Sequence, residues 1–311
     1  MSTFLHYLTL SAPLFGVVVL GYGIGKLSSW KREWTQRVSK FVFAVPLPAL
    51  LFHMMSTRTR GVPVDARLLL AYFGSCFIVF GIGRAVAHFL FRMDGVAQSV
   101  FALGGVFSNN VLLGVPLARL TLGEPAMASV ALVLVFNALT LWTLVTVSVE
   151  WARHGALNLS GLRKTTVQVL KNPIVIGILC GTAFALTGLT LPPAADTALS
   201  WVGHLAGPLA LLVLGMGTSE YGFSSGWRES AAICLLKLVL QPLVVWALAL
   251  ALGLPVLERQ AAVLLASLSV GANVYLMSNE FQTLQQPIAS SLVLSTLLAA
   301  VTTPLLLALA G

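Results

Sequence analysis

The chain has 311 residues, of which 58% are hydrophobic and only 9% carry a charge. Soluble domains carry about 25% charged residues, so this chain cannot cover itself with a polar surface, and a soluble globular fold is excluded. The formal net charge of +8 is spread over short loops between apolar stretches. It therefore indicates membrane topology, and no nucleic-acid partner is needed to explain it.

Apolar stretches of about 20 residues, each long enough to cross a hydrocarbon core of about 30 Å, recur along the sequence. Because these stretches are continuous, they exclude a closed β-barrel, whose strands alternate apolar and polar residues. The first stretch is no secretory signal, since residues 1–7 lack Lys and Arg. We predict an all-α polytopic membrane protein with ten transmembrane helices at 8–28, 38–57, 67–91, 97–121, 126–150, 172–190, 198–218, 229–252, 260–282 and 287–310.

Basic residues divide unequally between the two sides of this predicted topology. Thirteen of the eighteen lie on one side and five on the other. The positive-inside rule assigns the richer side to the cytoplasm, so we predict that both termini lie outside the cytoplasm. The thirteen are Lys26, Lys31, Arg32, Arg37, Lys40, Arg84, Arg92, Arg153, Arg163, Lys164, Lys171, Arg228 and Lys237, and the five are Arg58, Arg60, Arg67, Arg119 and Arg259.

The ten predicted spans form two similar sets of five, 1–150 and 172–311, on either side of a cytoplasmic linker at 151–171. Matching residues recur at nearly constant offsets of 160 and 162. Because five is an odd number, the second set enters the membrane from the opposite side, which makes an inverted repeat. The matched positions are Pro48 with Pro208, Gln98 with Gln260, and Pro125 with Pro287.

Helix-breaking residues interrupt spans four and nine near their middles. In "SNNVLLGVP" (108–116), Pro116 lacks the N–H of a regular helical turn and disfavours helical geometry at Val115. Irregular backbone at membrane depth is tolerated only where protein or a water-filled cavity surrounds it. We therefore predict that broken helices four and nine cross at the centre of the protein. The second break falls in "SVGANVYLMSNEF", at Gly271, Ala272 and Asn273.

Inverted repeats with discontinuous helices in matching positions are common in secondary transporters, which bind substrate near the midplane between the repeats. The exposed N-termini of half-helices present free N–H groups and partial positive charge to an anion. We predict a substrate site for an anion at Asn109, Asn110, Val115, Pro116, Gly271, Ala272 and Asn273. Possible supporting residues are Asn137, Gln241 and Lys237.

Several of these residues have a purely structural alternative. Asparagines in membrane helices often join one helix to another, and Gln241 precedes Pro242, so its amide can satisfy a carbonyl freed by that kink. Lys237 lies about two turns from the cytoplasmic face, where snorkelling to the interface is the ordinary behaviour. The GxxxG patterns at 21–25 and 177–181 indicate close helix packing, in a scaffold or at a dimer surface.

No carboxylate falls at the predicted midplane, which disfavours a proton relay. Sodium coupling stays open, with the ion at carbonyl and hydroxyl oxygens near Ser108, Ser267 and Ser269. The sequence has no HExxH motif and no pair of acids at membrane depth, and its three cysteines lack ligand spacing. We predict no enzymatic activity, no cofactor and no metal. A transporter-like sensor and a channel remain as alternative functions.

Four stretches resemble one known family, the auxin efflux carrier family. Asn109 with Gly114-Val115-Pro116 resembles the fourth-span motif of that family, and "GANVYLMSNEF" resembles its ninth-span motif. "KNPIVIGILCG" and "KLVLQPLVVW" are similar to its sixth and eighth spans. Family members often carry a proline one turn before the ninth-span asparagine, where this chain has Ser269. The resemblance covers nearly the whole chain.

The resemblance implies a bacterial organic-acid transporter of the cell (inner) membrane, with the fold of the sodium/bile acid symporters. It implies a scaffold of spans one, two, six and seven, and a transport domain of spans three to five and eight to ten, working as an elevator. The implied substrate is a small organic anion, such as malonate, malate or an indole carboxylate. The implied partners are this substrate, the lipid bilayer and a second copy in a homodimer.

Overall fold

The computed structural model describes residues 2–27, 32–58, 65–154, 167, 170–171, 173–219 and 226–310. Most of the predicted linker at 151–171 lies outside the described residues. The first half contains α1 (Ser2–Leu27), α2 (Arg32–Ala44), α3 (Pro46–Arg58), α4 (Ala66–Phe89), α5 (Gly95–Gly104), η1 (Asn110–Gly114), α6 (Val115–Thr121), η2 (Glu124–Ala126) and α7 (Met127–His154). The second half contains α9 (Pro173–Leu186), α10 (Pro193–Ser219), α11 (Trp227–Leu235), η3 (Leu236–Leu240), α12 (Gln241–Ala251), α13 (Val256–Ser267), α14 (Ala272–Glu280) and α15 (Gln285–Ala310).

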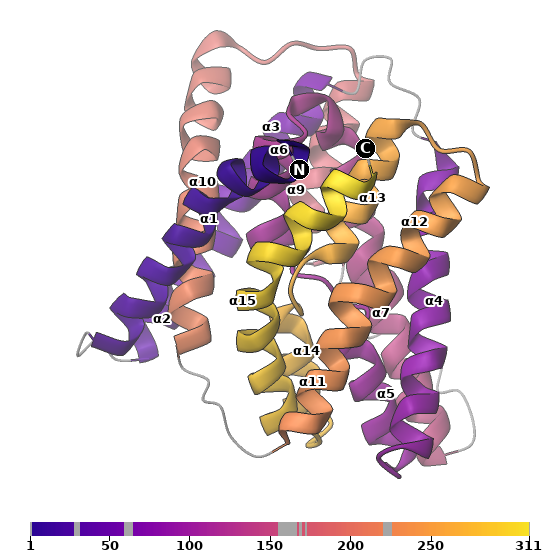
Figure 1. Cartoon of the computed structure of the whole chain (residues 1–311). Helices are drawn as coiled ribbons and strands as arrows, with labels where there is room; N and C mark the ends of the chain where they lie inside the picture. The colour runs from indigo at the N-terminus through magenta and orange to yellow at the C-terminus, as the bar shows by residue number, and fades with distance from the viewer. Residues whose placement is uncertain are drawn as a thin grey trace.

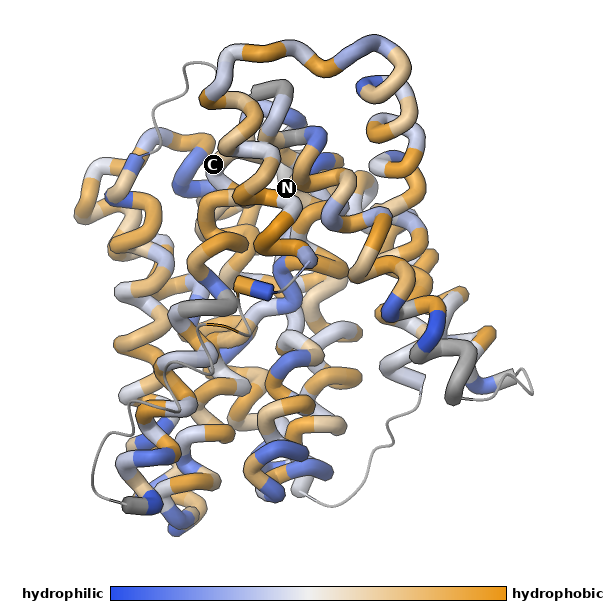
Figure 2. The backbone as a smooth tube through the Cα atoms, turned by 180° about the vertical axis from the view of Figure 1, so that it is seen from behind, coloured by the Kyte–Doolittle hydropathy of each residue, from blue (hydrophilic) through white to orange (hydrophobic). Residues whose placement is uncertain are grey.

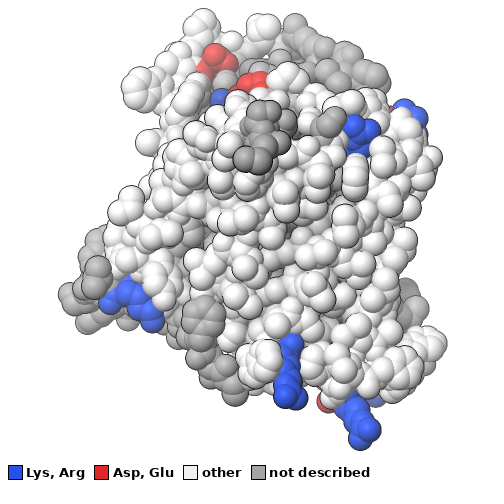
Figure 3. Space-filling model, viewed as in Figure 1, with Lys and Arg blue, Asp and Glu red and all other residues white. Residues whose placement is uncertain are grey.

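The described chain is helical, and its helices have the composition of membrane spans. Hydrophobic residues predominate along them (Figure 2), and on the face in Figure 3 a broad band without charged side chains separates the two ends. Four shorter apolar helices fall at Lys40–His53, Gly95–Gly104, Asn110–Thr121 and Pro173–Leu186. Six helices are long and apolar enough to cross a membrane: Phe4–Lys26, Ala66–Phe89, Glu124–Arg153, Pro193–Ser219, Trp227–Ala251 and Gln285–Ala310.

These observations confirm the prediction of an all-helical membrane protein. Nine of the ten predicted spans overlap one or two of these apolar helices, and the ninth span along the chain overlaps α13 and α14. The number of helices that cross the bilayer and the inverted orientation of the second half stay predictions, since no membrane is part of the structure.

The helices pack as two groups (Figure 1). In the first group, α1 packs along α10, and α3 packs against both α9 and α10. In the second group, α4 packs on α5 and α12, α13 packs on α12 and α15, and α11 packs on α15. The two groups meet where α1 contacts α15 and α6, and where α10 contacts η1 and α6.

Glycines set the spacing inside the first group. A Cβ atom on Gly21 would lie 2.3 Å from the carbonyl oxygen of Leu212, and one on Gly177 would lie 2.6 Å from that of Pro48. Any side chain at these positions would push α1 away from α10 or α9 away from α3. Both GxxxG patterns therefore serve packing within the chain. Of the two predicted roles, this is packing in a scaffold and not at a dimer surface.

Both termini lie at the same end of the molecule (Figure 1). The same end holds the beginnings of α4 and α13 and therefore Arg67 and Arg259, two of the five basic residues on the poorer side. The beginnings of α5, α11 and α15 lie at the opposite end. The structure thus places both termini at one end, and which end faces the cytoplasm stays a prediction.

Candidate functional site

Two predicted spans are interrupted in the middle of the second helix group. In span nine, α13 ends at Ser267 and α14 begins at Ala272, so the break lies where Gly271 predicted it. In span four, α5 ends at Gly104 and helix resumes at Asn110. The predicted break at Val115 and Pro116 is wrong, because the chain is helical there.

The helix continues through Pro116 because of the turn that precedes it. Residues 110–114 form a π-helix, in which the amides of Gly114 and Val115 reach back five residues, to the carbonyls of Asn109 and Asn110. This wider turn leaves room for the ring of Pro116, which lies at the start of α6. The amide of Val115 is therefore bonded and is not a free donor for substrate.

The two interruptions are joined to each other by backbone hydrogen bonds. The amide of Asn109 donates to the carbonyl of Ser269 at 2.9 Å, and the amide of Gly271 donates to the carbonyl of Phe107 at 2.8 Å. The reciprocal pair makes one antiparallel bridge between Ser108 and Val270. Broken backbone at this depth therefore finds its partners in the other broken segment, as the rule for irregular membrane segments requires.

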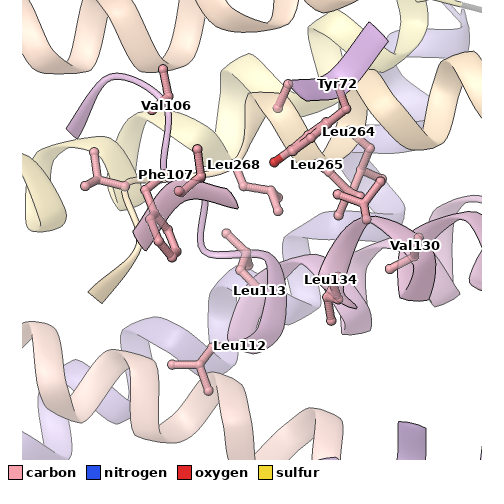
Figure 4. Packing of buried hydrophobic residues seen from close by; sticks show 14 of the residues in the cluster. Tyr72, Val106, Phe107, Leu112, Leu113, Val130, Leu134, Leu264, Leu265 and Leu268 are labelled. Atoms are coloured by element: carbon pink, nitrogen blue, oxygen red, sulfur yellow. The ribbon is translucent and has the colours of Figure 1, made fainter. Parts of the chain in front are cut away.

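The chain is closely packed around this bridge, and two nearby glycines leave little room for a side chain. A Cβ atom on Gly271 would lie 3.0 Å from both the Phe107 ring and the Ser108 carbonyl oxygen. A Cβ atom on Gly114 would lie 2.8 Å from the side chain of Leu268. Figure 4 shows buried hydrophobic side chains of span four among leucines of α13 and α7, which exclude water from the break. The labelled residues are Val106, Phe107, Leu112, Leu113, Leu264, Leu265, Leu268, Val130, Leu134 and Tyr72.

The carbonyl ends of the two broken helices are bonded to polar side chains from neighbouring helices. Gln241 Nε2 donates to the Val106 carbonyl at 3.0 Å, and Lys237 Nζ donates to the Ala266 carbonyl. Lys237 Nζ also donates to Gln241 Oε1 at 2.6 Å. The carbonyl of Ser267 accepts from Thr303 Oγ1 at 2.9 Å, as a third bond of this kind.

Two expectations for these side chains need correction. Lys237 does not snorkel to the interface, because it is fully buried and its ammonium group is bonded in the protein interior. Gln241 does not satisfy a carbonyl freed by the neighbouring Pro242, because its amide bonds to a carbonyl of span four. Both residues therefore belong to the crossing of spans four and nine.

The predicted asparagines have different environments. Asn109 is buried, with 6% of its surface exposed, and its Nδ2 has no hydrogen-bond partner within the described part of the chain. Asn110 Nδ2 donates to Tyr72 Oη at 3.0 Å, and that hydroxyl lies 3.4 Å from Ser108 Oγ. Asn137 on α7 is also buried, and its Oδ1 lacks a described partner. The free amide donor at the crossing is thus that of Asn109.

The beginning of α14 is more open than the beginning of η1. Ala272 is exposed and Asn273 is half-buried, whereas Asn110 is fully buried. As the first amides of their helix, those of Ala272 and Asn273 lack an intrahelical acceptor. The second broken helix therefore begins with backbone donors on residues that are at least partly exposed.

A cavity of about 330 Å³ lies between the two helix groups, on the α6 side of the crossing. Val115, Pro116 and Arg119 of α6 line it, and His204 and Gly207 of α10 face them. The Arg119 guanidinium pairs with Glu124 at 2.6 Å. Asn109, Asn110 and residues 271–273 do not line this cavity, so the predicted site residues divide between the crossing and the cavity.

Comparison with known proteins decides the family. A family model described as "Membrane transport protein" matches residues 6–158 and 157–307 of the chain. The chain belongs to this family of membrane transport proteins. The resemblance to the auxin efflux carriers is confirmed by this match.

Individual relatives of this membrane transport protein cover nearly its full length. A Rhizobium meliloti (strain 1021) protein with the name "Putative malonate transporter" is 27% identical over 296 residues, which are 93% of this chain and 91% of the relative. The "Uncharacterized transporter YfdV" of Escherichia coli (strain K12) is 24% identical over 304 residues, 94% of either chain. A protein of the same name from Shigella flexneri matches equally.

Several residues of this membrane transport protein could not be found from the sequence. Tyr72, Ser295 and Thr303 bond to the interrupted segments but lie in other helices, and their partners are 25 or more residues away. From the sequence, Arg119 counts only as a topological charge. Its spacing of three from Pro116 places both residues on one face of a helix, which is the signal that could have linked them. Within the described residues, no group of three or more His, Cys, Asp or Glu side chains is placed to hold a metal.

Proposed function

We propose that this membrane transport protein is a secondary carrier of small organic anions, carboxylates above all. The observation that carries the proposal is the buried, unpartnered amide donor of Asn109 at the crossing of two broken helices. Beside it, the first amides of α14 at Ala272 and Asn273 also lack intrahelical acceptors. Donors at helix N-termini select anions, because the helix dipole adds partial positive charge there.

The cavity beside α6, apart from the crossing, is large enough for a small carboxylate. The cavity beside α6 measures about 330 Å³, at the lower end of the range typical for ligand pockets. Arg119 and His204 lie on its walls, and the Arg119 guanidinium already pairs with Glu124. The relative named "Putative malonate transporter" supports a dicarboxylate such as malonate as the first candidate, with malate and indole carboxylates next.

We assign the movement to an elevator. Spans one, two, six and seven (α1–α3, α9 and α10) form the scaffold, and the remaining spans, which hold the crossing, form the transport domain. The packing of the helices in two groups supports this division. The reciprocal bonds at the crossing join 107 to 271 and 109 to 269. At an offset of 162, residue 107 corresponds to 269 and residue 109 to 271, so the repeat relation exchanges the two bonds. This symmetry agrees with an inverted repeat.

The function is tested with purified protein in proteoliposomes. Counterflow of labelled malonate, against liposomes loaded with unlabelled malonate, malate or indole acetate, is expected for a carrier and absent from empty liposomes. A thermal-shift screen of the same acids identifies which of them bind. Binding without counterflow would favour a sensor, and flux without exchange would favour a channel. No binding and no flux with any organic acid would contradict the proposal.

The elevator predicts that a bond between the two groups stops transport. A Cβ atom on Gly207 of α10 would lie 3.7 Å from Cβ of Pro116 on α6, which is within the range for a disulfide. We expect the Gly207→Cys, Pro116→Cys double variant, in a Cys180→Ser background, to lose counterflow on oxidation and regain it on reduction. The reduced double variant is the control. Full counterflow with a complete disulfide would exclude movement between α6 and α10.

A further inference from the structure

Lys237 occupies an unusual place for a charged side chain. It lies in η3, a π-helical turn that separates α11 from α12 in the middle of span eight. Its side chain is fully buried, and the two acceptors of its ammonium group are uncharged oxygens, Gln241 Oε1 and the Ala266 carbonyl. Buried charges in membrane proteins are rare and usually functional, so this one needs an explanation.

The Ala266 carbonyl depends on Lys237 for a partner. In a continuous helix this carbonyl would accept from the amide of Val270, four residues later. The chain leaves the helix after Ser267, and the Val270 amide donates instead to Ser295 Oγ at 3.0 Å. The ammonium group therefore replaces the hydrogen bond that the broken helix has lost.

The same ammonium group also acts on the other broken helix, through Gln241. Gln241 Oε1 accepts from Lys237, and Gln241 Nε2 donates to the Val106 carbonyl, which follows the end of α5. One amino group thus joins the carbonyl ends of α13 and α5. Each helix C-terminus carries partial negative charge, so two negative helix ends meet at this group.

In many secondary transporters, sodium ions bind at such places, coordinated by carbonyls of unwound segments and of half-helix C-terminal ends. We propose that the ammonium group of Lys237 is a built-in cation that takes the place of such an ion and makes the crossing independent of sodium. The inference deepens the proposed function, since it removes sodium as the coupling ion of the same site. Of the predicted sodium ligands, Ser267 Oγ donates to the Leu264 carbonyl at 2.8 Å, and Ser269 Oγ is buried without a partner among the described residues.

Replacement of Lys237 tests the inference without any substrate. Lys237→Ala removes the charge and leaves a space between two bare carbonyl oxygens, whereas Lys237→Met removes the charge and fills the space. We expect both variants to melt at lower temperature than the native protein. Sodium chloride should raise the melting temperature of Lys237→Ala by roughly 2–4 °C at ten times its dissociation constant for sodium. Choline chloride should not raise it.

Three comparisons make the result specific. The native protein should melt at the same temperature in sodium, potassium and choline chloride, and Lys237→Met should show no response to sodium. Arg84→Ala is the control for loss of a partly buried cation, because Arg84 bonds to Ser148 and Gln98 away from the crossing, and sodium should not stabilise it.

Sodium stabilisation of the native protein, or equal behaviour of Lys237→Ala and Lys237→Met, would overturn the inference. If Lys237→Ala does not fold, the native protein still tests the inference, since counterflow that requires sodium would contradict it. If no organic acid supported counterflow, the proposed function would be contradicted. The melting temperatures in sodium and choline chloride would still test the inference about Lys237. The two failures are thus distinguishable.

Discussion

The two sides of the crossing differ in how their backbone groups are satisfied. On the carbonyl side, the oxygens of Val106, Ala266 and Ser267 each have a side-chain donor from a neighbouring helix. On the amide side, Asn109 Nδ2 is buried without a described partner, and Ala272 at the start of α14 is exposed. The same pair of broken helices is thus closed at one pole and open at the other.

This difference separates structural polar residues from ligand-binding ones. A buried group that lacks a partner costs about 1–3 kcal/mol, so a fold keeps one only where something else compensates. The three carbonyls named at this pole serve stability, since each of them already has a donor. The amide pole retains the Asn109 donor, which an anion requires, beside one unpartnered acceptor, Asn110 Oδ1. Substitutions at the two poles should therefore change different measured quantities.

The largest effect is expected at the closed pole, for Gln241→Leu. The change leaves the Val106 carbonyl without a donor and takes one acceptor from Lys237. Together these losses should lower the free energy of unfolding by about 3–5 kcal/mol, measured as a fall in melting temperature. Gln282→Leu is the matched control, because Gln282 is exposed and its amide bonds only to the nearby Asn279 carbonyl. Equal melting of the two variants would show that the carbonyl pole contributes nothing to stability.

At the open pole, Asn109→Ala should weaken anion binding and change stability little. A hydrogen bond to a charged group contributes about 1.5–3 kcal/mol, which corresponds to a roughly ten- to hundredfold loss of affinity. Asn109→Asp should weaken binding further, because it adds a negative charge beside the anion. Titration calorimetry or thermal shift with the acid that binds best measures both quantities.

The adjacent residue provides the control for Asn109. Asn110→Ala removes the bond to Tyr72 Oη and should lower the free energy of unfolding by about 1 kcal/mol, with affinity nearly unchanged. If Asn109→Ala loses stability and keeps its affinity, Asn109 is an interhelical bond and the site lies elsewhere. Asn273→Ala should follow Asn109→Ala, since its side chain is half-buried at the start of α14.

The smallest effect is expected for Thr303→Val, again at the closed pole. Valine has nearly the shape of threonine but leaves the Ser267 carbonyl without its donor. The free energy of unfolding should fall by about 1–2 kcal/mol, while affinity for the anion stays the same. Thr302→Val, at the half-buried neighbouring position, removes only a bond within α15 and should have little effect on the melting temperature. A loss of affinity without a loss of stability would place Thr303 at the open pole.

The sequence locates both broken helices, but it places only one of the two breaks at the right residue. Gly271 marks the second break correctly: it precedes α14, and a Cβ atom there would make a tight contact of 3.0 Å with the Ser108 carbonyl oxygen. Pro116 marked the first break wrongly, because a π-helical turn before it absorbs the proline. A proline shows that one hydrogen bond is missing, but the neighbouring turns decide whether the helix ends there.

The partners of the polar residues were beyond the reach of the sequence. Asn109 was recognisable as a candidate from its depth within span four, which follows from the length of the apolar stretch. Lys237 was expected at the interface, because snorkelling depends only on distance from a helix end. Its actual acceptor, the Ala266 carbonyl, belongs to another helix that is free to accept only because span nine is broken. Such a pairing depends on tertiary structure and leaves no local pattern.

The reciprocal backbone bonds at the crossing also set an order for biogenesis. The amide of Asn109 enters the membrane early in synthesis, and its acceptor on Ser269 is made about 160 residues later. At about 5–20 residues per second, the first broken helix waits roughly 8–30 s for the second. During that interval its unpaired groups need water, lipid headgroups or an insertase as temporary partners. The first half, made alone, should therefore remain accessible to membrane proteases, whereas co-expression with the second half should protect it.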